Sequence, residues 1–260
     1  MVELGPLFFI LAFFLGASSG SFACAAASRT AAGAKWWGLE RSRCDCCGAA
    51  LAPRDLVPAL SFLALRGRCR FCGARIPRRC FAAELVCGAL CALFLWRFGA
   101  SYSFLFSSAS LPFLAFHTIT DADTGYIYDS WAFAMAGAGL LLRIAGGFSA
   151  VLDGAAGAAA GFAFIYAIIF LSRGRMGAGD AVLMLGIGAF MGLKFTAAAL
   201  YAGFMSGGVI ALVLLAAGKV TRKSAVPLGP FLCAGSAAAM LFGGKLAEYL
   251  GLTVPWPWTV

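Results

Sequence analysis

Two aspartates at the edges of apolar segments are the residues best suited to chemistry. Asp121 ends one apolar segment, and Asp180 begins another directly after the turn Gly177-Ala178-Gly179. Ionisable side chains are costly near the hydrocarbon core of a bilayer, so each is a functional candidate. Two carboxylates that converge in a partly dry cleft can share a proton, so that one activates water while the other polarises a carbonyl. This pair therefore predicts aspartic-protease chemistry, without a metal or a covalent intermediate.

Residue types alone leave two other interpretations of these aspartates open. They could cap helices, as Asp180 would after its glycine-rich turn, or they could belong to a proton or ion pathway. His117 lies four residues before Asp121 on the same helical face, where we expect a packing or hydrogen-bonding role. The remaining acidic candidates near apolar segments are Glu84, Asp123, Asp129 and Asp153. A Ser-His-Asp hydrolase is disfavoured, because the chain has one histidine and no G-x-S-x-G motif.

Four cysteines form two C-x2-C pairs with the spacing of a metal site. The pairs are Cys44/Cys47 and Cys69/Cys72, and a glycine follows each of them. Each pair can place two thiolates on one knuckle turn, and two knuckles complete a tetrahedral site for Zn2+. Cys46 is a poorer ligand candidate because it adjoins Cys47. The sequence therefore predicts a structural zinc site, with reduced thiols or a redox pair as the alternatives.

The other cysteines lie in or beside apolar segments. We expect them to be small buried residues, not ligands: Cys24, Cys80, Cys87, Cys91 and Cys233. Disulfides are not expected among the cysteines of the zinc loop if that loop is cytoplasmic.

The composition predicts that membrane-spanning helices position these groups. Of the 260 residues, 62% are hydrophobic and only 12% are charged, which excludes a cytosolic enzyme, a disordered chain and a small disulfide scaffold. The apolar runs lack the period-two alternation of a β-barrel. We predict an all-α polytopic membrane protein with about eight transmembrane helices, near residues 4–28, 80–97, 102–120, 130–148, 154–171, 181–193, 195–217 and 228–250.

The basic residues predict the orientation of the chain in the membrane. Residues 29–79 hold 11 of the 20 Lys and Arg residues, so by the positive-inside rule this loop is cytoplasmic and the N-terminus lies outside. A cleaved signal peptide is disfavoured because Glu3, and no cation, precedes the first apolar segment. The net charge of +9 thus indicates contact with a lipid bilayer, not with nucleic acid.

The same pattern predicts three parts of the chain. Residues 1–28 form the first transmembrane helix, residues 29–79 form the cytoplasmic zinc-binding loop, and residues 80–260 form a seven-helix bundle that carries the aspartates.

Taken in order along the chain, the motifs resemble those of the bacterial prepilin peptidases, the type IV leader peptidases of the GxGD class of membrane aspartic proteases. Gly20-Ser21-Phe22 with Arg29 is similar to the opening motif of this family, and the loop with the four cysteines is similar almost residue by residue. Asp121 to Asp129 resembles the D-x5-[IL]-P-D motif. Gly177-Ala178-Gly179-Asp180 is a G-x-G-D sequence, and Glu84 falls where a further family motif ends.

This resemblance implies an activity and its residues. Family members remove the basic leader after a glycine from prepilins of type IV pili and pseudopilins of type II secretion, at the cytoplasmic face of the bacterial inner membrane. Asp121 and Asp180 match the catalytic pair, and Gly177, Gly179, Asp129 and Glu84 match supporting positions. Many members also methylate the new N-terminus with S-adenosylmethionine, an activity associated with the N-terminal loop.

The chain departs from the family pattern at three single positions, and the stretch from Arg79 to Glu84 keeps its family motif only loosely. Cys24 stands in place of an asparagine, Tyr128 in place of a proline and Val182 in place of a lysine. Two functions of other classes stay open at this point: a proton-coupled transporter that uses the carboxylates, and a membrane scaffold that docks a partner through the zinc loop. Neither the oligomeric state nor the particular pilin substrate follows from the sequence.

Overall fold

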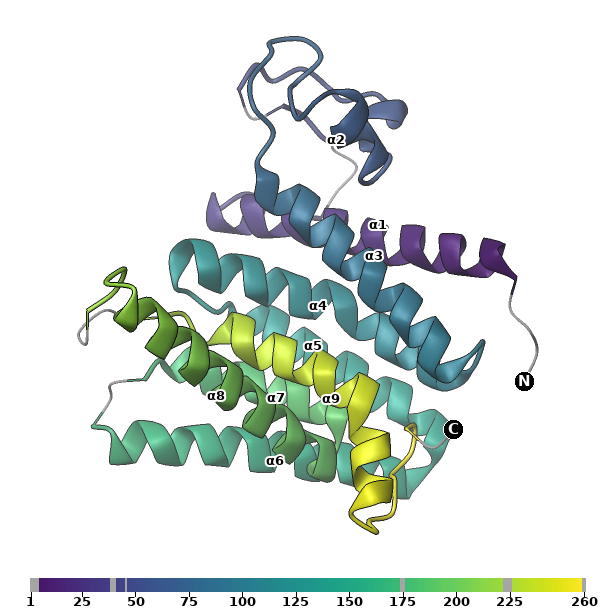
Figure 1. Ribbon diagram of the computed structural model, residues 1–260, viewed down its shortest axis with the longest axis vertical. Coiled ribbons are helices and arrows are strands. Elements are labelled where there is room, and N and C mark those ends of the chain that lie inside the picture. Colours follow the sequence, from purple (N-terminus) through teal and green to yellow (C-terminus); the bar gives the residue numbers. More distant parts are fainter. Residues whose placement is uncertain (1–4, 38–40, 45, 174–175, 222–225, 259–260) are drawn as a thin grey trace. The chain divides into compact units, whose positions relative to one another are not determined.

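The protein is described by a computed structural model that covers residues 5–37, 41–44, 46–173, 176–221 and 226–258. These residues form helices and connecting turns, and their only strand-like pairings are two isolated β-bridges. The predicted all-α class is therefore confirmed. The chain divides into two compact units, residues 1–100 and 101–260 (Figure 1). The three-part division at residues 28 and 79 stays a prediction.

Unit 1 consists of two long helices and the loop between them. Its elements are α1 (Pro6–Ala31), η1 (Pro53–Leu56), α2 (Leu60–Ala64) and α3 (Arg78–Phe98). Helix α1 packs along α3, and a Cβ atom at Gly20 would collide with the backbone of Ala83 in α3. Small residues permit such close approach of helix backbones, where van der Waals packing drives helix association.

Unit 2 is a bundle with α7 inside it. Its elements are α4 (Tyr102–Thr124), α5 (Asp129–Arg143), η2 (Ile144–Gly146), α6 (Phe148–Leu171), α7 (Ala178–Met191), α8 (Leu193–Ala216) and α9 (Gly229–Tyr249). Helix α7 contacts α5, α6, α8 and α9, and ten of its 14 residues are buried (Figure 1). Its backbone meets that of α6 at Gly188 and Gly157, where a side chain on either residue would clash with the other helix.

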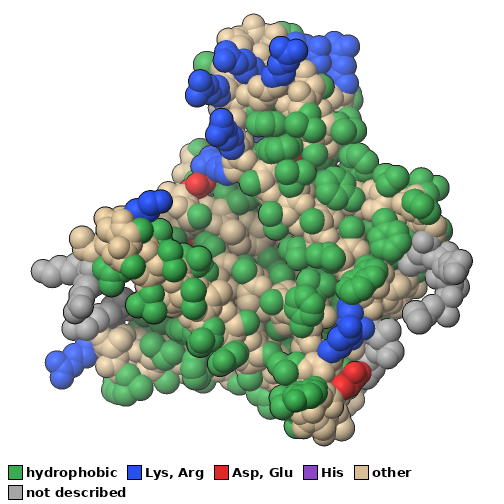
Figure 2. Space-filling view, viewed as in Figure 1, with side chains coloured by type: hydrophobic (Ala, Val, Ile, Leu, Met, Phe, Trp, Pro, Cys, Tyr) green, Lys and Arg blue, Asp and Glu red, His purple; other side chains and the backbone are tan. Residues whose placement is uncertain are grey.

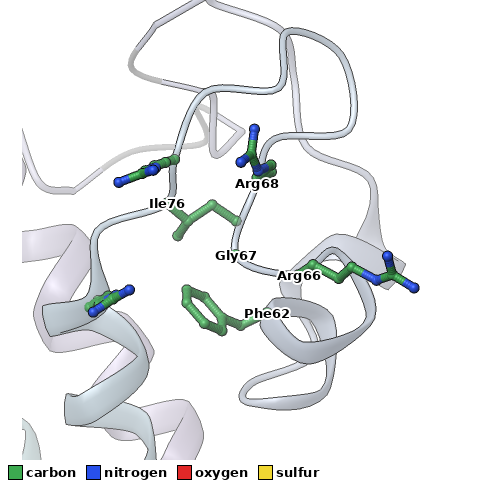
Figure 3. Close-up of a pocket in the computed structure, with 7 residues that line it drawn as sticks. Phe62, Arg66, Gly67, Arg68 and Ile76 are labelled. Carbon is green, nitrogen blue, oxygen red and sulfur yellow. The ribbon is translucent and has the colours of Figure 1, made fainter.

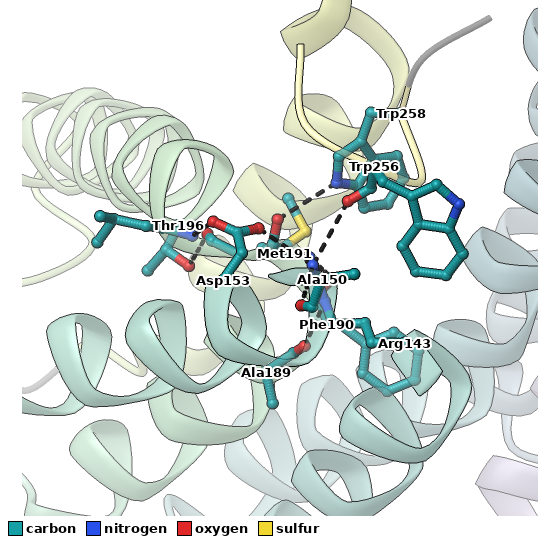
Figure 4. Close-up of polar contacts among 11 residues, drawn as sticks. Arg143, Ala150, Asp153, Ala189, Phe190, Met191, Thr196, Trp256 and Trp258 are labelled. Atoms are coloured by element: carbon teal, nitrogen blue, oxygen red, sulfur yellow. Dashed lines mark hydrogen bonds and ion pairs between the residues drawn. The ribbon is translucent and has the colours of Figure 1, made fainter. Parts of the chain in front are cut away.

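A buried arginine holds the end of α7 that lies away from Asp180. The Arg143 guanidinium is fully buried and forms an ion pair of 3.1 Å with Asp153 on α6 (Figure 4). It also donates hydrogen bonds to four carbonyl oxygens, those of Ala150, Ala189, Phe190 and Trp256. A buried cation is costly unless it is paired and hydrogen-bonded, and here each guanidinium nitrogen has at least one acceptor. Arg143 thereby ties the C-terminal segment and α6 to the corner between α7 and α8.

Five helices in the described part of the chain are long and apolar enough to cross a membrane. They are α1, α3, α6, α8 and α9, while α7 is apolar but shorter. Each of the eight predicted apolar segments overlaps a different one of the helices α1 and α3 to α9, so the approximate positions of the segments are confirmed. The number that crosses the bilayer stays a prediction. Figure 2 shows hydrophobic side chains over the visible face of the helices and basic side chains gathered on the loop between α1 and α3.

Candidate active site and cysteine cluster

Asp121 lies in the last turn of α4 and is almost completely buried. Its carboxylate accepts a hydrogen bond of 2.8 Å from the backbone N–H of Gly229, the first residue of α9. A Cβ atom on Gly229 would lie 2.7 Å from Oδ2 of Asp121, too close for an unstrained contact. Gly229 therefore allows the backbone of α9 to approach the carboxylate. Sequence reasoning missed this residue, although the run Pro227-Leu228-Gly229-Pro230 marked a helix start.

Asp180 lies in the first turn of α7 and is the third residue of this helix, which begins at Ala178. Gly177 occupies the N-cap position, so Asp180 does not cap the helix as one interpretation of the sequence required. A Cβ atom on Gly179 would lie 2.9 Å from Cβ of Ile127, so this glycine lets the turn pack against the segment between α4 and α5. No close contact requires a glycine at position 177.

The two aspartates belong to one electrostatic site. Both lie outside the five candidate membrane spans, and both are at least nine-tenths buried. Burial raises the pKa of Asp180 to about 7, and the negative charge of Asp121 adds to this effect. Burial also raises the pKa of Asp121, while the Gly229 N–H opposes the rise by stabilising the charged form. The end of α4 and the start of α7 thus hold two carboxylates, and the surroundings of Asp121 stabilise a negative charge better than those of Asp180.

The other acidic candidates lie elsewhere. Asp129 is exposed at the first residue of α5, where its charge favours the helix N-terminus. Asp153 is paired with Arg143, as described above. Glu84 is buried in unit 1, where its Oε2 accepts a hydrogen bond of 2.7 Å from the N–H of Ala59. His117 is fully buried and packs edge-on against Phe116, in agreement with the packing role expected for it.

The structure brings together the four cysteines of the two C-x2-C pairs. Their Sγ atoms all lie within 4.8 Å of one another, which suits a single metal ion: Cys44, Cys47, Cys69 and Cys72. Each pair forms a tight turn that a glycine closes by donating its N–H to the carbonyl of the first cysteine, at 2.9 Å for Gly48 and 3.0 Å for Gly73. Both glycines have a positive φ, near 70°. Backbone N–H groups of Cys47 and Cys46 lower the pKa of Cys44 to about 7, which favours the thiolate that binds metals.

The structure corrects the expectation for two of the remaining cysteines. Cys87, Cys91 and Cys233 are buried, as predicted, and form no disulfide within the described part of the chain, but Cys24 and Cys80 form one between α1 and α3. The reason is the close packing of these helices one turn earlier at Gly20, which leaves the two Cα atoms 5.5 Å apart. This distance is typical of a disulfide. Spacing along the chain could not reveal it, because 56 residues separate the two cysteines.

Unit 1 also contains a cavity of about 520 Å3 beside the cysteine cluster. Residues of α1, the loop and α3 line it, among them Arg29, Asp55, Phe81 and Glu84. Asp55 is held by Arg70 through an ion pair of 2.7 Å, which lowers the pKa of the carboxyl group. Its second oxygen, Oδ2, is buried and makes no hydrogen bond within the described part of the chain. The cavity therefore has the size of a small-molecule site, and Oδ2 of Asp55 on its wall is a hydrogen-bond acceptor that a ligand could use.

Comparisons with known proteins agree with these features. A model of the bacterial peptidase A24 N-terminal domain matches residues 14–98, and a model of the type IV leader peptidase family matches residues 108–212. A protein of Burkholderia pseudomallei (strain 1026b) named prepilin leader peptidase/N-methyltransferase is 35% identical over 82% of this chain and 71% of its own length. Proteins of the same name from Bacillus subtilis (strain 168) and Myxococcus xanthus (strain DK1622) are 31% and 34% identical, over 80% and 85% of this chain and 84% and 67% of their own lengths. No solved structure matches.

The two family models together cover most of both units, and they follow the order in which the motifs occur. The long apolar helices agree with an integral membrane protein. The chain therefore belongs to the type IV leader peptidase family.

Proposed function

We propose that this protein cleaves the leader peptide from prepilins or pseudopilins with Asp121 and Asp180 as the catalytic pair. The observation that carries this proposal is the burial of both carboxylates in one electrostatic site, where the charge of Asp121 raises the pKa of Asp180. The names of the relatives, prepilin leader peptidase/N-methyltransferase, support the choice of substrate.

The unequal surroundings of the two carboxylates support different roles for them. Asp121 carries the negative charge, since the N–H of Gly229 stabilises it, and acts as the base that removes a proton from water. Asp180 holds its proton near neutral pH and donates it to the carbonyl oxygen of the scissile bond. The water oxygen attacks the carbonyl carbon and gives a tetrahedral gem-diol. As the C–N bond breaks, Asp121 gives its proton to the leaving amine and Asp180 takes a proton back from one hydroxyl, which restores both side chains. In this scheme two side chains of the protein carry every proton transfer.

The membrane setting explains how such a site meets its substrate. A prepilin is itself an apolar helix with a basic leader, so it enters the bilayer beside the helices of this protein and packs against their small residues. We propose that the protein resides in the bacterial inner membrane with its active site at the cytoplasmic face. The cytoplasmic orientation rests on the 11 basic residues of segment 29–79.

We propose that unit 1 carries the methylation activity and binds S-adenosylmethionine in the cavity of about 520 Å3. This molecule supplies an electrophilic methyl group for the new terminal amine. The unpartnered Oδ2 of Asp55 fits it, because the ligand carries amino and hydroxyl donors. Arg70 orients the Asp55 carboxylate and keeps it ionised.

We propose Zn2+ as the ion of the cysteine cluster, with Cys44, Cys47, Cys69 and Cys72 as its ligands. Four sulfur ligands leave no open coordination position, so the ion would be structural and would fix the fold of the loop.

A cleavage assay with purified full-length protein tests the catalytic pair. We expect Asp121→Asn and Asp180→Asn each to lower the cleavage rate of a prepilin by about 10²–10⁴-fold, because each removes one of the two proton-transfer groups. Loss of the leader is measured by gel shift. Asp123→Asn is the matched control, because Asp123 is exposed and lies only two residues from Asp121. This variant should cleave at the rate of the wild type.

The folded state of each variant is checked by its thermal unfolding. Cleavage retained by both Asp121→Asn and Asp180→Asn would exclude this pair as the catalytic groups.

A further inference from the structure

A second, smaller cavity in unit 1 is lined mainly by cations. It measures about 290 Å3 and is lined by Phe62, Ile76 and four arginines, Arg66, Arg68, Arg75 and Arg78 (Figure 3). All four arginines are exposed, and no acidic residue lines the cavity. Figure 3 shows Phe62 and Ile76 facing the cavity, while the side chain of Arg66 runs outward from its rim.

The second cysteine knuckle places two of these cations directly opposite each other. Arg68 and Arg75 flank the Cys69–Cys72 turn and form an antiparallel β-bridge. The backbone is pinned further by a hydrogen bond of 2.8 Å from the Ile76 N–H to the carbonyl of Gly67. Gly67 has a φ of +67°, and a Cβ atom there would lie 2.8 Å from the Phe62 ring. Like charges opposite each other in such a pair destabilise it, so the knuckle holds two guanidinium groups in an unfavourable arrangement.

The first knuckle of the same loop lacks this arrangement. There the equivalent bridge joins Arg43 to Ala50, which carries no charge. Nη1 of Arg43 also donates a hydrogen bond of 3.3 Å to the carbonyl of Gly48. The concentration of charge is therefore specific to the second knuckle and does not follow from the knuckle fold itself.

Nothing within the described part of unit 1 neutralises the cavity. The side chains of its four arginines make no hydrogen bond or ion pair with other described residues. The carboxylate of Asp55 is already paired with Arg70. Arg78 is moreover the first residue of α3, where the helix dipole disfavours a cation. An anion in the cavity would relieve both unfavourable arrangements.

We propose that this cavity binds the phosphate of an anionic phospholipid headgroup. Guanidinium groups bind phosphate through paired, charge-assisted hydrogen bonds. The position favours a lipid as the source, because the candidate membrane span α3 begins at Arg78, on the wall of the cavity. Two leucines of the short helix that carries Phe62, Leu60 and Leu63, are 54% and 61% exposed. They offer an apolar surface that a lipid uses and that inorganic phosphate does not.

Thermal unfolding of the full-length protein in neutral detergent tests this site. We expect short-chain phosphatidylglycerol to raise the unfolding midpoint, and phosphatidylcholine and inorganic phosphate at equal concentration to leave it unchanged. In the double variant Arg68→Gln/Arg75→Gln, half of the maximal shift should require about tenfold more phosphatidylglycerol, since two charge-assisted bonds are lost. Arg43→Gln is the matched control from the first knuckle and should respond as the wild type does.

Misfolding cannot mimic the expected result. Without lipid the double variant should unfold at the same temperature as the wild type or above it, because the opposed like charges are gone. Equal shifts in the double variant and the wild type would overturn the proposed site. A shift produced equally by inorganic phosphate would overturn the lipid as its ligand.

Discussion

At the scale of single residues, a backbone group 108 positions away supports the charge on Asp121. The Gly229 N–H is free to donate because it opens α9, where the first N–H groups have no partner within the helix. The absence of a side chain at Gly229 is equally important, since a Cβ atom would collide with the carboxylate. The same glycine therefore controls both the position and the charge of the proposed base.

We predict that Gly229→Ala lowers the cleavage rate by about a hundredfold, because displacement of a reacting group by about 1 Å costs that much. Initial rates with a prepilin substrate measure the effect. Gly208→Ala on α8 is the control, since a Cβ atom there meets no other atom within 4 Å. Equal rates for the two variants would show that Gly229 does not position Asp121.

At the scale of elements, the two cysteine knuckles are small units that need each other. The described part of the loop has only two short helical elements, η1 and α2, and two isolated β-bridges. Neither η1 nor α2 contains a buried residue, so little apolar burial stabilises the loop. A metal ion shared by both knuckles would supply the missing stability, as in other small metal-bound modules.

We predict that the purified protein contains about one Zn2+ per chain and that Cys44→Ser/Cys69→Ser loses it, because each knuckle then lacks a thiolate. Metal analysis by mass spectrometry measures this content. Cys46→Ser is a matched control, since Cys46 is exposed beside the cluster but is not part of it. An unchanged zinc content in a variant in which all four cysteines are replaced would reject the proposed ligands.

At the scale of the whole molecule, the proposed activities belong to different units. The aspartates Asp121 and Asp180 lie in unit 2, whereas the cysteine cluster and the cavity with Asp55 lie in unit 1. The two family models also meet between these units, at residues 98 and 108. Substitutions in one unit should therefore affect one activity and spare the other.

We predict that Asp55→Asn lowers methylation of the mature N-terminus by about tenfold or more, through loss of a charged acceptor, and leaves leader cleavage unchanged. Mass spectrometry of the processed substrate detects both reactions at once. Arg54→Gln, an exposed neighbour, is the control. Full methylation by Asp55→Asn would remove Asp55 from the proposed methyl-donor site, and loss of cleavage would contradict the separation of the units.

The sequence alone determined the class of the fold, the positions of the helices and the candidate groups. Continuous apolar runs predict helices wherever a chain must satisfy its backbone hydrogen bonds within lipid, and eight such runs coincide with helices of the structure. The spacing of the C-x2-C pairs likewise predicted a cluster that the structure assembles. These features depend on neighbours along the chain, so a pattern of residues is enough to reveal them.

Only the tertiary structure decided which distant groups meet. The contact of Gly229 with Asp121, the disulfide of Cys24 with Cys80 and the burial of Arg143 beside Asp153 all join residues of different helices. The opposition of Arg68 and Arg75 likewise requires the knuckle to close. Helix packing angles and turn geometry set these contacts. These contacts produce no repeating pattern in the sequence, because each one needs only a single residue from each of the two segments that meet.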